Sequence, residues 1–440
     1  MTRIAVLGAG ISGVTTAYFL NQAGHDVTVV DRRLYAAMET SFANGGQLSA
    51  SNAEVWNQPS TLVKGLRWMF QKDAPLLLNP KPSWHKYGWL AEFLWAIRKY
   101  RSNTITTTQL AIEARRHLFE IAEQEGIDFN LEKRGILHFY HDRASFEVAT
   151  RANALLQAGG LERYAVTPEE IHQIEPTLQG EYFGGYYTPS DSTGDIHKFT
   201  RGLANACERK GVRFLYGREV RDMQFPGGNV ALDLDRIDAA TDRPTGELER
   251  LGFDAVVVCG GVGSRKLAAM AGDRLNVYPV KGYSITVHLD DEASVRGAPW
   301  VSLLDEKAKI VTSRLGRDRF RVAGTAEFNG ENRDIRADRI DPLIRWTRAN
   351  FTMDTSRVVP WAGLRPMMPD MMPRVQRGKQ PGVYYNTGHG HLGWTLSAAT
   401  ATQLLALVES DLRVQRPVVD TSGLSAMPDP EPATSASPSV

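Results

Sequence analysis

A glycine pattern within the first 31 residues constrains the fold of this 440-residue chain more than any other feature. The apolar run Ile4–Leu7 predicts a short buried strand, and the turn Gly8–Gly13 (GAGISG) follows it directly. Apolar residues at helical spacing continue to Gly24, and Val27–Val30 predicts a second buried strand. Strand, glycine turn, helix and strand make a βαβ unit, which predicts a parallel sheet covered by helices.

The same turn matches the GxGxxG pattern of dinucleotide-binding folds, in the required position between a strand and a helix. Gly8 permits the tight turn, Gly10 lets the backbone approach a pyrophosphate, and Gly13 lets the helix pack on the sheet. The helix N-terminus then presents free N–H groups to the phosphates. Asp31 ends the second strand at the spacing of a carboxylate that binds a ribose hydroxyl. A ligand-free turn is the alternative, and the motif alone does not separate FAD from NAD.

Two further glycine turns favour FAD, because an NAD enzyme needs neither. The backbone of Ser41–Gln47 (SFANGGQ) can approach an extended cofactor. Gly388–Gly393 (GHGHLG) precedes a helix whose N-terminus can face the flavin pyrimidine, where negative charge develops on reduction. We therefore expect non-covalent FAD. The expected cofactor contacts are Gly8, Ala9, Gly10, Ile11, Ser12, Gly13, Asp31, Arg32, Ser41, Asn44, Gly45, Gly46, Gln47, Val220, Gly260, Gly261, Gly388, His389, Gly390, Leu392, Gly393 and Trp394.

Segments typical of a nucleotide-binding domain occur at both ends of the chain and in its middle. A helix through Lys210 leads into the strand Val212–Leu215, and a strand at Gly382–Asn386 precedes the helix Thr395–Glu409. Residues 276–350 alternate and are rich in β-formers, which predicts an antiparallel sheet. The expected fold is α/β: a Rossmann-type FAD-binding domain with an inserted α+β substrate domain built on an antiparallel sheet. The expected boundaries are 1–55, 190–275 and 352–415 for the FAD-binding domain, 56–189 and 276–351 for the substrate domain, and 416–440 for a disordered tail.

Composition and charge exclude several classes of function. Lys plus Arg is 51 and Asp plus Glu is 50, so the chain has no electrostatic footprint for nucleic acid. Cys207 and Cys259 form no CxxC motif, and we expect Cys259 to be a small buried residue rather than a flavin attachment site. His389 and His391 have no further ligands at a workable spacing, so no metal is expected. No apolar stretch approaches a membrane span, which predicts a cytoplasmic protein or one peripheral on the inner membrane.

Residues 56–100 contain five of the nine tryptophans. Within them, Leu90, Phe93, Leu94 and Ile97 form an apolar stripe at helical spacing, and basic residues follow. Such a stripe usually packs onto its own domain, which is the interpretation we favour. The alternative is an interfacial patch that meets lipid or a quinone.

At this point the sequence resembles the bacterial D-amino acid dehydrogenase family, within the glycine oxidase and sarcosine oxidase group. The resemblance runs to about residue 410 and rests on motifs in the expected order. Besides GAGISG these are Glu39–Gln47 (ETSFANGGQ), Ser192–Thr200 (STGDIHKFT), Tyr278–Thr286 (YPVKGYSIT), Gly363–Asp370 (GLRPMMPD) and Asn386–Thr395 (NTGHGHLGWT). It implies an FAD enzyme that converts a D-amino acid to a 2-oxo acid and ammonia, and that passes electrons to a respiratory acceptor such as a quinone.

Four residues are candidates for the substrate side of the reaction. Arg365 in the GLRP motif is expected to bind the substrate carboxylate, because a planar guanidinium matches it in a bidentate way; a surface salt bridge is the alternative. Tyr278 and Tyr283 can cover the substrate or bind its carboxylate, or can simply pack in the core. Lys281 lies near the flavin or in solvent.

One departure from the family concerns the substrate pocket. Met371 and Met372 stand where the family has a small residue followed by proline, and if they line the pocket they alter its preference.

Two other functions remain open at this stage. The first is a related FAD oxidase or a dehydrogenase of cyclic imino acids such as D-proline or hydroxyproline. The second is a flavin-bound subunit that only scaffolds a larger assembly. Peroxide production, a substrate panel and flavin bleaching separate these alternatives.

Overall fold

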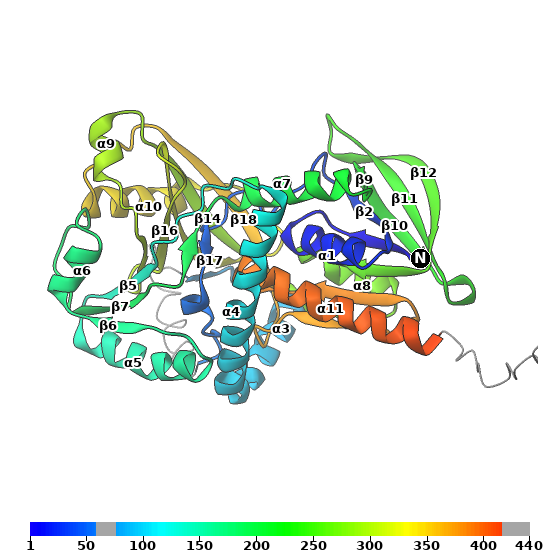
Figure 1. Cartoon of the computed structure of the whole chain (residues 1–440), viewed down its shortest axis with the longest axis horizontal. Helices are drawn as coiled ribbons and strands as arrows, with labels where there is room; N and C mark the ends of the chain where they lie inside the picture. Colours follow the sequence, from blue (N-terminus) through cyan, green and yellow to red (C-terminus); the bar gives the residue numbers. More distant parts are fainter. Residues whose placement is uncertain (59–75, 416–440) are drawn as a thin grey trace, which may run out of the picture.

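The computed structural model describes residues 1–58 and 76–415. One half of the molecule is built on a six-stranded sheet with the order β19-β20-β13-β1-β2-β9 (Figure 1). The pairs from β20 to β9 are parallel, and β19 joins β20 antiparallel. The strands are β1 (Arg3–Leu7), β2 (Asp26–Asp31), β9 (Arg213–Tyr216), β13 (Ala255–Val258), β19 (Arg374–Arg377) and β20 (Val383–Thr387). The predicted parallel sheet is thereby confirmed.

Alternation along the strands places this sheet between two apolar layers. Ile4 and Val6 of β1 pack into one core, whereas Ala5 and Leu7 pack into another. Because successive strand residues face opposite sides, a continuous apolar run such as Ile4–Leu7 is buried on both.

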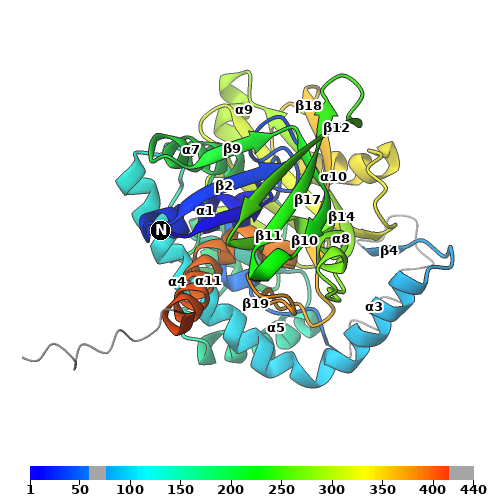
Figure 2. The same cartoon turned by 90° about the vertical axis from the view of Figure 1, so that its right-hand side faces the viewer.

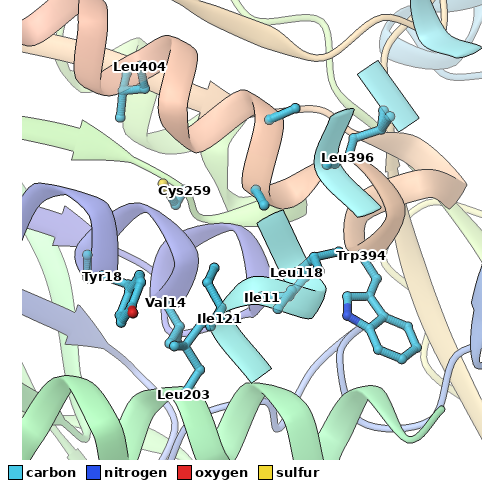
Figure 3. Close-up of a cluster of buried hydrophobic side chains, with 14 of the residues drawn as sticks. Ile11, Val14, Tyr18, Leu118, Ile121, Leu203, Cys259, Trp394, Leu396 and Leu404 are labelled. Atoms are coloured by element: carbon cyan, nitrogen blue, oxygen red, sulfur yellow. The ribbon is translucent and has the colours of Figure 1, made fainter. Parts of the chain in front are cut away.

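Helices form the layer on the first face. They are α1 (Ile11–Gln22), α4 (Tyr100–Glu125), α7 (Ile196–Arg209) and α11 (Gly393–Gln415). Figure 3 shows where their side chains meet, with Val14, Leu118, Leu203 and Leu404 among them. Segments far apart in the sequence therefore share one core beneath the glycine turn.

A three-stranded antiparallel sheet and a short helix form the layer on the second face (Figure 2). They are β10 (Arg218–Gln224), β11 (Val230–Asp238), β12 (Arg243–Phe253) and α8 (Ser264–Met270). Val220 and Leu232 from this sheet pack with Val256 and Val258 of β13.

The other half of the molecule is built on a large sheet with the order β18-β14-β17-β16-β15-β5-β7-β6, in which β4 also pairs with β17. Its strands are β4 (Leu76–Leu78), β5 (Ile136–Tyr140), β6 (Tyr164–Val166), β7 (Gly184–Thr188), β14 (Tyr278–His288), β15 (Ser302–Asp305), β16 (Ile310–Arg314), β17 (Arg319–Phe328) and β18 (Val358–Met367). The helices of this half are α3 (Trp84–Trp95), α5 (Arg143–Ala158), α6 (Pro168–Ile174), α9 (Glu292–Gly297) and α10 (Ala337–Asn350). A small ladder of β3 (Gln47–Leu48) and β8 (Ser192–Thr193) and the 3-10 turns 50–52, 96–99, 226–228, 261–263 and 390–392 complete the described chain.

Three details differ from the expectations. The large sheet is mixed rather than purely antiparallel, because β15 runs parallel to β5 and β4 parallel to β17. The end of the expected all-β stretch is helix α10, in which Ile340, Leu343 and Thr347 are buried at helical spacing. Strand β18, expected in the FAD-binding domain, pairs with β14 in the large sheet. The domain boundaries otherwise stay a prediction, and the expected tail 416–440 lies outside the described residues.

Candidate active site

A cavity of about 1390 Å³ lies between the two halves of the molecule. One side is formed by the β1–α1 turn, the end of β2 and the start of α11, and the opposite side by β14 and β18. Sites for small ligands span about 300–1,000 Å³. This cavity therefore has room for a large cofactor and a substrate together.

The glycine turn at one side of the cavity has no room for side chains. A Cβ on Gly8 would lie 2.6 Å from the Cys259 carbonyl oxygen, and Gly8 has a φ of +117°. A Cβ on Gly13 would lie 1.8 Å from the Gly8 carbonyl oxygen, so α1 packs directly on the turn. The Ile11 N–H donates to Ser41 Oγ at 3.0 Å, which joins the first two glycine turns. This close backbone packing fits the cradle that a dinucleotide pyrophosphate requires.

Most of the expected cofactor contacts line the cavity. They are Gly8, Gly10, Ile11, Ser12, Asp31, Arg32, Ser41, Asn44, Gly45, Gly46, Gln47, Val220, Gly260, Gly261, His389, Gly390, Leu392, Gly393 and Trp394. The structure places Ala9, Gly13 and Gly388 behind this wall, where they shape the turns instead of lining the cavity.

Asp31 fastens the glycine turn as well as lining the cavity. Its Oδ2 accepts a hydrogen bond from the Ala9 N–H at 2.6 Å, and its Oδ1 accepts from the Arg33 N–H at 2.7 Å. Burial raises the pKa of this carboxyl group, against the effect of the two N–H donors. Each carboxylate oxygen keeps a further lone pair, so the expected bond to a ribose hydroxyl stays a prediction.

The second glycine turn lies against the large sheet. A Cβ on Gly45 would lie 2.9 Å from the Val311 side chain, and one on Gly46 would lie 3.0 Å from Ser313. Gln47 then reaches across, because its Nε2 donates to Ser302 Oγ at 2.7 Å. The turn thus connects the cofactor side of the cavity to the substrate side.

The third glycine turn leads into α11, whose first residues line the cavity. His389 holds this turn: its Nε2 lies 2.9 Å from Thr400 Oγ1 and its Nδ1 lies 3.4 Å from Ser12 Oγ. Burial lowers the pKa of His389 to about 4, so the ring is neutral at physiological pH. The N-terminus of α11 therefore faces the cavity with its own partial positive charge, and the neutral His389 ring adds no further charge to it.

Arg365 projects from β18 into the cavity. One nitrogen, Nη1, donates to the Thr325 carbonyl oxygen at 3.0 Å. Among the described residues, none offers Arg365 a carboxylate at ion-pair distance, and burial lowers its pKa to about 10. The guanidinium lies flat against Gly282 of β14, where a Cβ would lie 2.3 Å from Nη2. A half-buried cation in a cavity wall that lacks an anion is the arrangement expected of an anion-binding residue.

The other three candidates of the substrate side are placed differently. Tyr283 lines the cavity, but its hydroxyl donates to Glu327 Oε2 at 2.7 Å. Lys281 is fully buried outside the cavity wall, where Nζ donates to Asn332 Oδ1 at 2.7 Å. Tyr278 packs in the aromatic cluster beneath α3. We therefore correct the expected cavity position of Lys281 and Tyr278.

A wall that the sequence interpretation missed runs along residues 52–58. Burial alternates there: Asn52, Glu54, Trp56 and Gln58 are half-buried and line the cavity, whereas Ala53 and Asn57 are buried behind them. Val55 is buried and also borders the cavity. The polar residues at alternate positions from Asn52 were the available signal, but they do not reveal what that side faces.

His391 also lines the cavity, although the sequence analysis considered it only as a metal ligand. The Trp56 ring stacks on it at 4.9 Å, and its Nε2 donates to the Asn52 carbonyl oxygen at 3.2 Å. Burial lowers the pKa of His391 to about 4, and the positive charge of Arg365 acts in the same direction. The neutral ring therefore keeps Nδ1 as an acceptor near Arg365.

Other expectations have direct structural outcomes. Met371 and Met372 do not line the cavity; Met371 is buried beneath α3, and Met372 lies against Thr107 of α4. Burial raises the pKa of the Cys259 thiol to about 12. Within residues 1–58 and 76–415, no cluster of three His, Cys, Asp or Glu residues is suited to a metal. Over the same residues, no helix has the length and apolar character needed to cross a membrane.

Comparisons with known proteins give consistent results. The family described as FAD dependent oxidoreductase matches residues 3–407. D-amino acid dehydrogenase 3 of Mesorhizobium japonicum is 61% identical over 415 residues, which cover 94% of this chain and 98% of that protein. D-amino acid dehydrogenase of Paramagnetospirillum magneticum is 42% identical, covering 92% of this chain and 94% of its own length.

Solved structures share the fold at low identity. Glycine oxidase from Geobacillus kaustophilus has a TM-score of 0.71 at 19% identity, and the match covers 93% of this chain and 95% of that one. L-proline dehydrogenase from P. horikoshii has a TM-score of 0.68 at 16% identity, covering 93% and 94%. At these identities the likeness establishes the fold alone.

Proposed function

Because this chain belongs to the FAD dependent oxidoreductase family, we propose that it oxidises D-amino acids to 2-oxo acids and ammonia. The proposal combines the names of the most similar relatives with one structural observation, the unpaired guanidinium of Arg365 in the cavity. An amino acid carries a carboxylate next to the carbon that is oxidised. A cation that holds this carboxylate therefore also positions the reacting carbon.

The residues of the cavity fit FAD. Gly8, Gly10 and the N-terminus of α1 would hold the pyrophosphate, and Asp31 would bind the ribose. The N-terminus of α11 would face the flavin ring system, where its partial positive charge favours the anionic reduced form. When bound, FAD supplies the two-electron oxidant.

The remaining work belongs to the side chains of this chain. Arg365 orients the substrate through its carboxylate, with Gly282 as the flat surface beneath the guanidinium. His391 accepts a hydrogen bond from the substrate amine through Nδ1, because Nε2 is committed to Asn52. The Cα carbon would lose a hydride to the two-electron oxidant and the nitrogen a proton to water, and water then hydrolyses the imine to the 2-oxo acid and ammonia.

Substitution of Arg365 tests the carboxylate assignment. Arg365→Lys keeps the charge but loses the planar fork, and Arg365→Ala loses both, so kcat/KM should fall progressively. In Arg365→Ala, the fall in kcat/KM should correspond to a loss of about 2–5 kcal/mol of transition-state binding, with unchanged FAD content. An amine substrate without a carboxylate is the control, since it should not respond. Normal kcat/KM of Arg365→Ala for D-amino acids would place the carboxylate elsewhere.

We also propose that the electrons pass to a quinone at a membrane surface. The observation in favour is α3, which borders the cavity through Trp84, His85 and Gly88 and presents aromatic residues outward. Trp84 is 94% exposed and Trp95 is 63% exposed. Basic residues follow directly, and the Arg98 guanidinium lies over the Trp95 ring. Exposed aromatic and basic residues together are typical of an interfacial helix.

Vesicle binding tests the membrane proposal. A Trp95→Ser variant, outside the cavity wall, should weaken co-sedimentation with anionic phospholipid vesicles and reduce a water-soluble dye acceptor at the normal rate. Tyr164→Ser is the matched control, because Tyr164 is 53% exposed on β6 and lies apart from α3. If the wild-type protein does not bind the vesicles, the membrane proposal is wrong, and the proposed oxidation chemistry is unaffected.

A further inference from the structure

The cavity wall also holds a group of charged side chains that the chemistry above does not use. Glu54, Arg163, Glu306 and Lys309 all line it, together with His138. They come from four separate segments: the wall at 52–58, β5, the chain after α5, and the turn between β15 and β16. Buried charges are costly, so their presence in a cavity wall calls for an occupant that matches them.

Two of these charges neutralise each other. Lys309 Nζ donates to Glu306 Oε2 at 2.5 Å, and His138 Nδ1 lies 3.5 Å from Glu306 Oε1. Lys309 has a φ of +55°, a conformation that side chains other than glycine rarely adopt, so the turn holds this lysine in place at a cost in backbone strain. Burial and nearby cations lower the pKa of His138 to about 4, so the ring is neutral.

Glu54 forms no salt bridge with a described residue. Its Oε1 accepts hydrogen bonds from the Tyr100 hydroxyl and from Gln58 Nε2, which fix the carboxylate. No described residue donates to Oε2, and the charges of Lys309 and Arg163 act on Glu54 only from beyond ion-pair distance. Burial accordingly raises the pKa of Glu54. A donor or a positive charge arriving in the cavity would satisfy Oε2.

Of the four charged groups in this part of the cavity wall, Glu54 is the one open to a ligand. The carboxylates of Glu54 and Glu306 stand against the cations of Lys309 and Arg163, so the charges of the wall balance. Lys309 and Glu306 are joined to each other. Arg163 is 4% exposed, lies over the Tyr186 ring at 4.8 Å, and has Nε and Nη2 buried. Glu54 therefore offers the accessible carboxylate oxygen of the group.

The position of Glu54 relative to Arg365 brings the two ends of one occupant together. Glu54 stands two residues from Asn52 and from Trp56, both of which contact His391 beside Arg365. Asn52 ends a 3-10 turn and Trp56 reaches the same ring, so the chain bends around His391 and keeps Glu54 in the same wall of the cavity. A long flexible stem, as in lysine or arginine, can join a carboxylate at Arg365 to a cation at Glu54.

We propose that Glu54 makes this enzyme selective for D-amino acids with a long, cationic side chain, such as D-lysine, D-ornithine or D-arginine. Arg365 binds the substrate carboxylate and Glu54 binds the ammonium or guanidinium at the other end. An apolar side chain of the same length leaves the Glu54 carboxylate buried and unpaired, which costs binding. The proposal rests on the proposed oxidation of D-amino acids.

The first test compares wild-type kcat/KM for D-lysine and D-norleucine, which differ only in the terminal ammonium. We expect at least a tenfold preference for D-lysine, and a preference that falls roughly 10- to 100-fold in Glu54→Gln. Glu331→Gln is the matched control: it removes another carboxylate of the same cavity wall and should keep the preference. Equal use of both substrates by the wild type, or an unchanged preference in Glu54→Gln, overturns the proposal. Preference for D-glutamate also overturns it.

A binding measurement tests the same geometry without catalysis. In 6-aminohexanoate, a carboxylate and an ammonium stand at the ends of a chain that cannot be oxidised at Cα. Calorimetry on the FAD-loaded enzyme should show it binding at least tenfold tighter than hexanoate, and equal binding contradicts the proposal even if Glu54→Gln fails to fold. These results can be told apart from a failure of the proposed oxidation of D-amino acids. In that case D-alanine and every other D-amino acid would leave the flavin oxidised.

Discussion

Replacing Gly282 with alanine places a methyl group where the Arg365 guanidinium lies. The new Cβ would stand 2.3 Å from Nη2, 2.4 Å from Cζ and 2.5 Å from Nη1 of Arg365. Non-bonded heavy atoms normally separate by about 3.5–4.0 Å, so the guanidinium must move by roughly 1 to 1.5 Å. A misplacement of about 1 Å can cost 100-fold in rate. We therefore expect Gly282→Ala to lower kcat/KM for amino acids about 100-fold.

Steady-state kinetics with a dye acceptor measure this loss, and the flavin absorbance per protein monitors the cofactor. Because Gly282 has no left-handed φ, alanine introduces no backbone strain, and FAD content should stay normal. Gly252→Ala on β12 is the matched control, since its Cβ meets nothing within 4 Å. Wild-type kcat/KM in Gly282→Ala, or a loss equal to that in Gly252→Ala, would refute the placement of Arg365 at the substrate carboxylate.

Three further results are expected. Asp31→Asn should weaken FAD binding roughly 10- to 100-fold in a flavin fluorescence titration, because both carboxylate oxygens hold backbone N–H groups of the turn; equal affinity would remove Asp31 from the site. Gly13→Ala should yield protein without flavin, because its Cβ would meet the Gly8 carbonyl at 1.8 Å; a yellow variant contradicts this. The pKa of His389 is about 4 when folded and about 6.5 when unfolded, so the unfolded chain binds the extra proton below pH 6.5. The free energy of unfolding should therefore fall by about 2 kcal/mol from pH 7 to pH 5 on account of His389; urea unfolding that shows the same pH dependence in His389→Gln refutes this contribution.

The dinucleotide unit was predictable from sequence because its determinants are local. Gly8 and Gly13 contact each other within six residues, and the strand on either side of the turn is recognised from a short apolar run. Such features need no knowledge of distant segments. The turn geometry, the parallel strand pair and the helix between them therefore follow from the first 31 residues.

The environment of Arg365 was not predictable, although the GLRP motif singled out the residue itself. The guanidinium of Arg365 lies against Gly282, and the pairing of β14 with β18 brings the two residues together. This register joins segments about 80 residues apart, and no local pattern specifies it. For the same reason, the sequence did not show that β18 belongs to the large sheet.

The charged part of the cavity wall was missed for a similar reason. Glu54, His138 and Lys309 come from segments that meet only in the folded chain. A lone glutamate among small and apolar residues is normally a solvent-exposed surface side chain, so nothing marked Glu54 as part of a cavity wall. Helix α10 is different: its apolar spacing was visible, but the surrounding strand-like sequence dominated the interpretation.

Anaerobic reduction of the bound flavin tests the central claim most directly. The purified protein, loaded with FAD and free of oxygen and acceptors, is mixed with each D-amino acid and with its L-enantiomer, and the flavin absorbance is followed. The account predicts that D-amino acids bleach the flavin, that L-enantiomers do not, and that Arg365→Ala bleaches far more slowly. Flavin that stays oxidised with every D-amino acid, or that is bleached equally by both enantiomers, would contradict it.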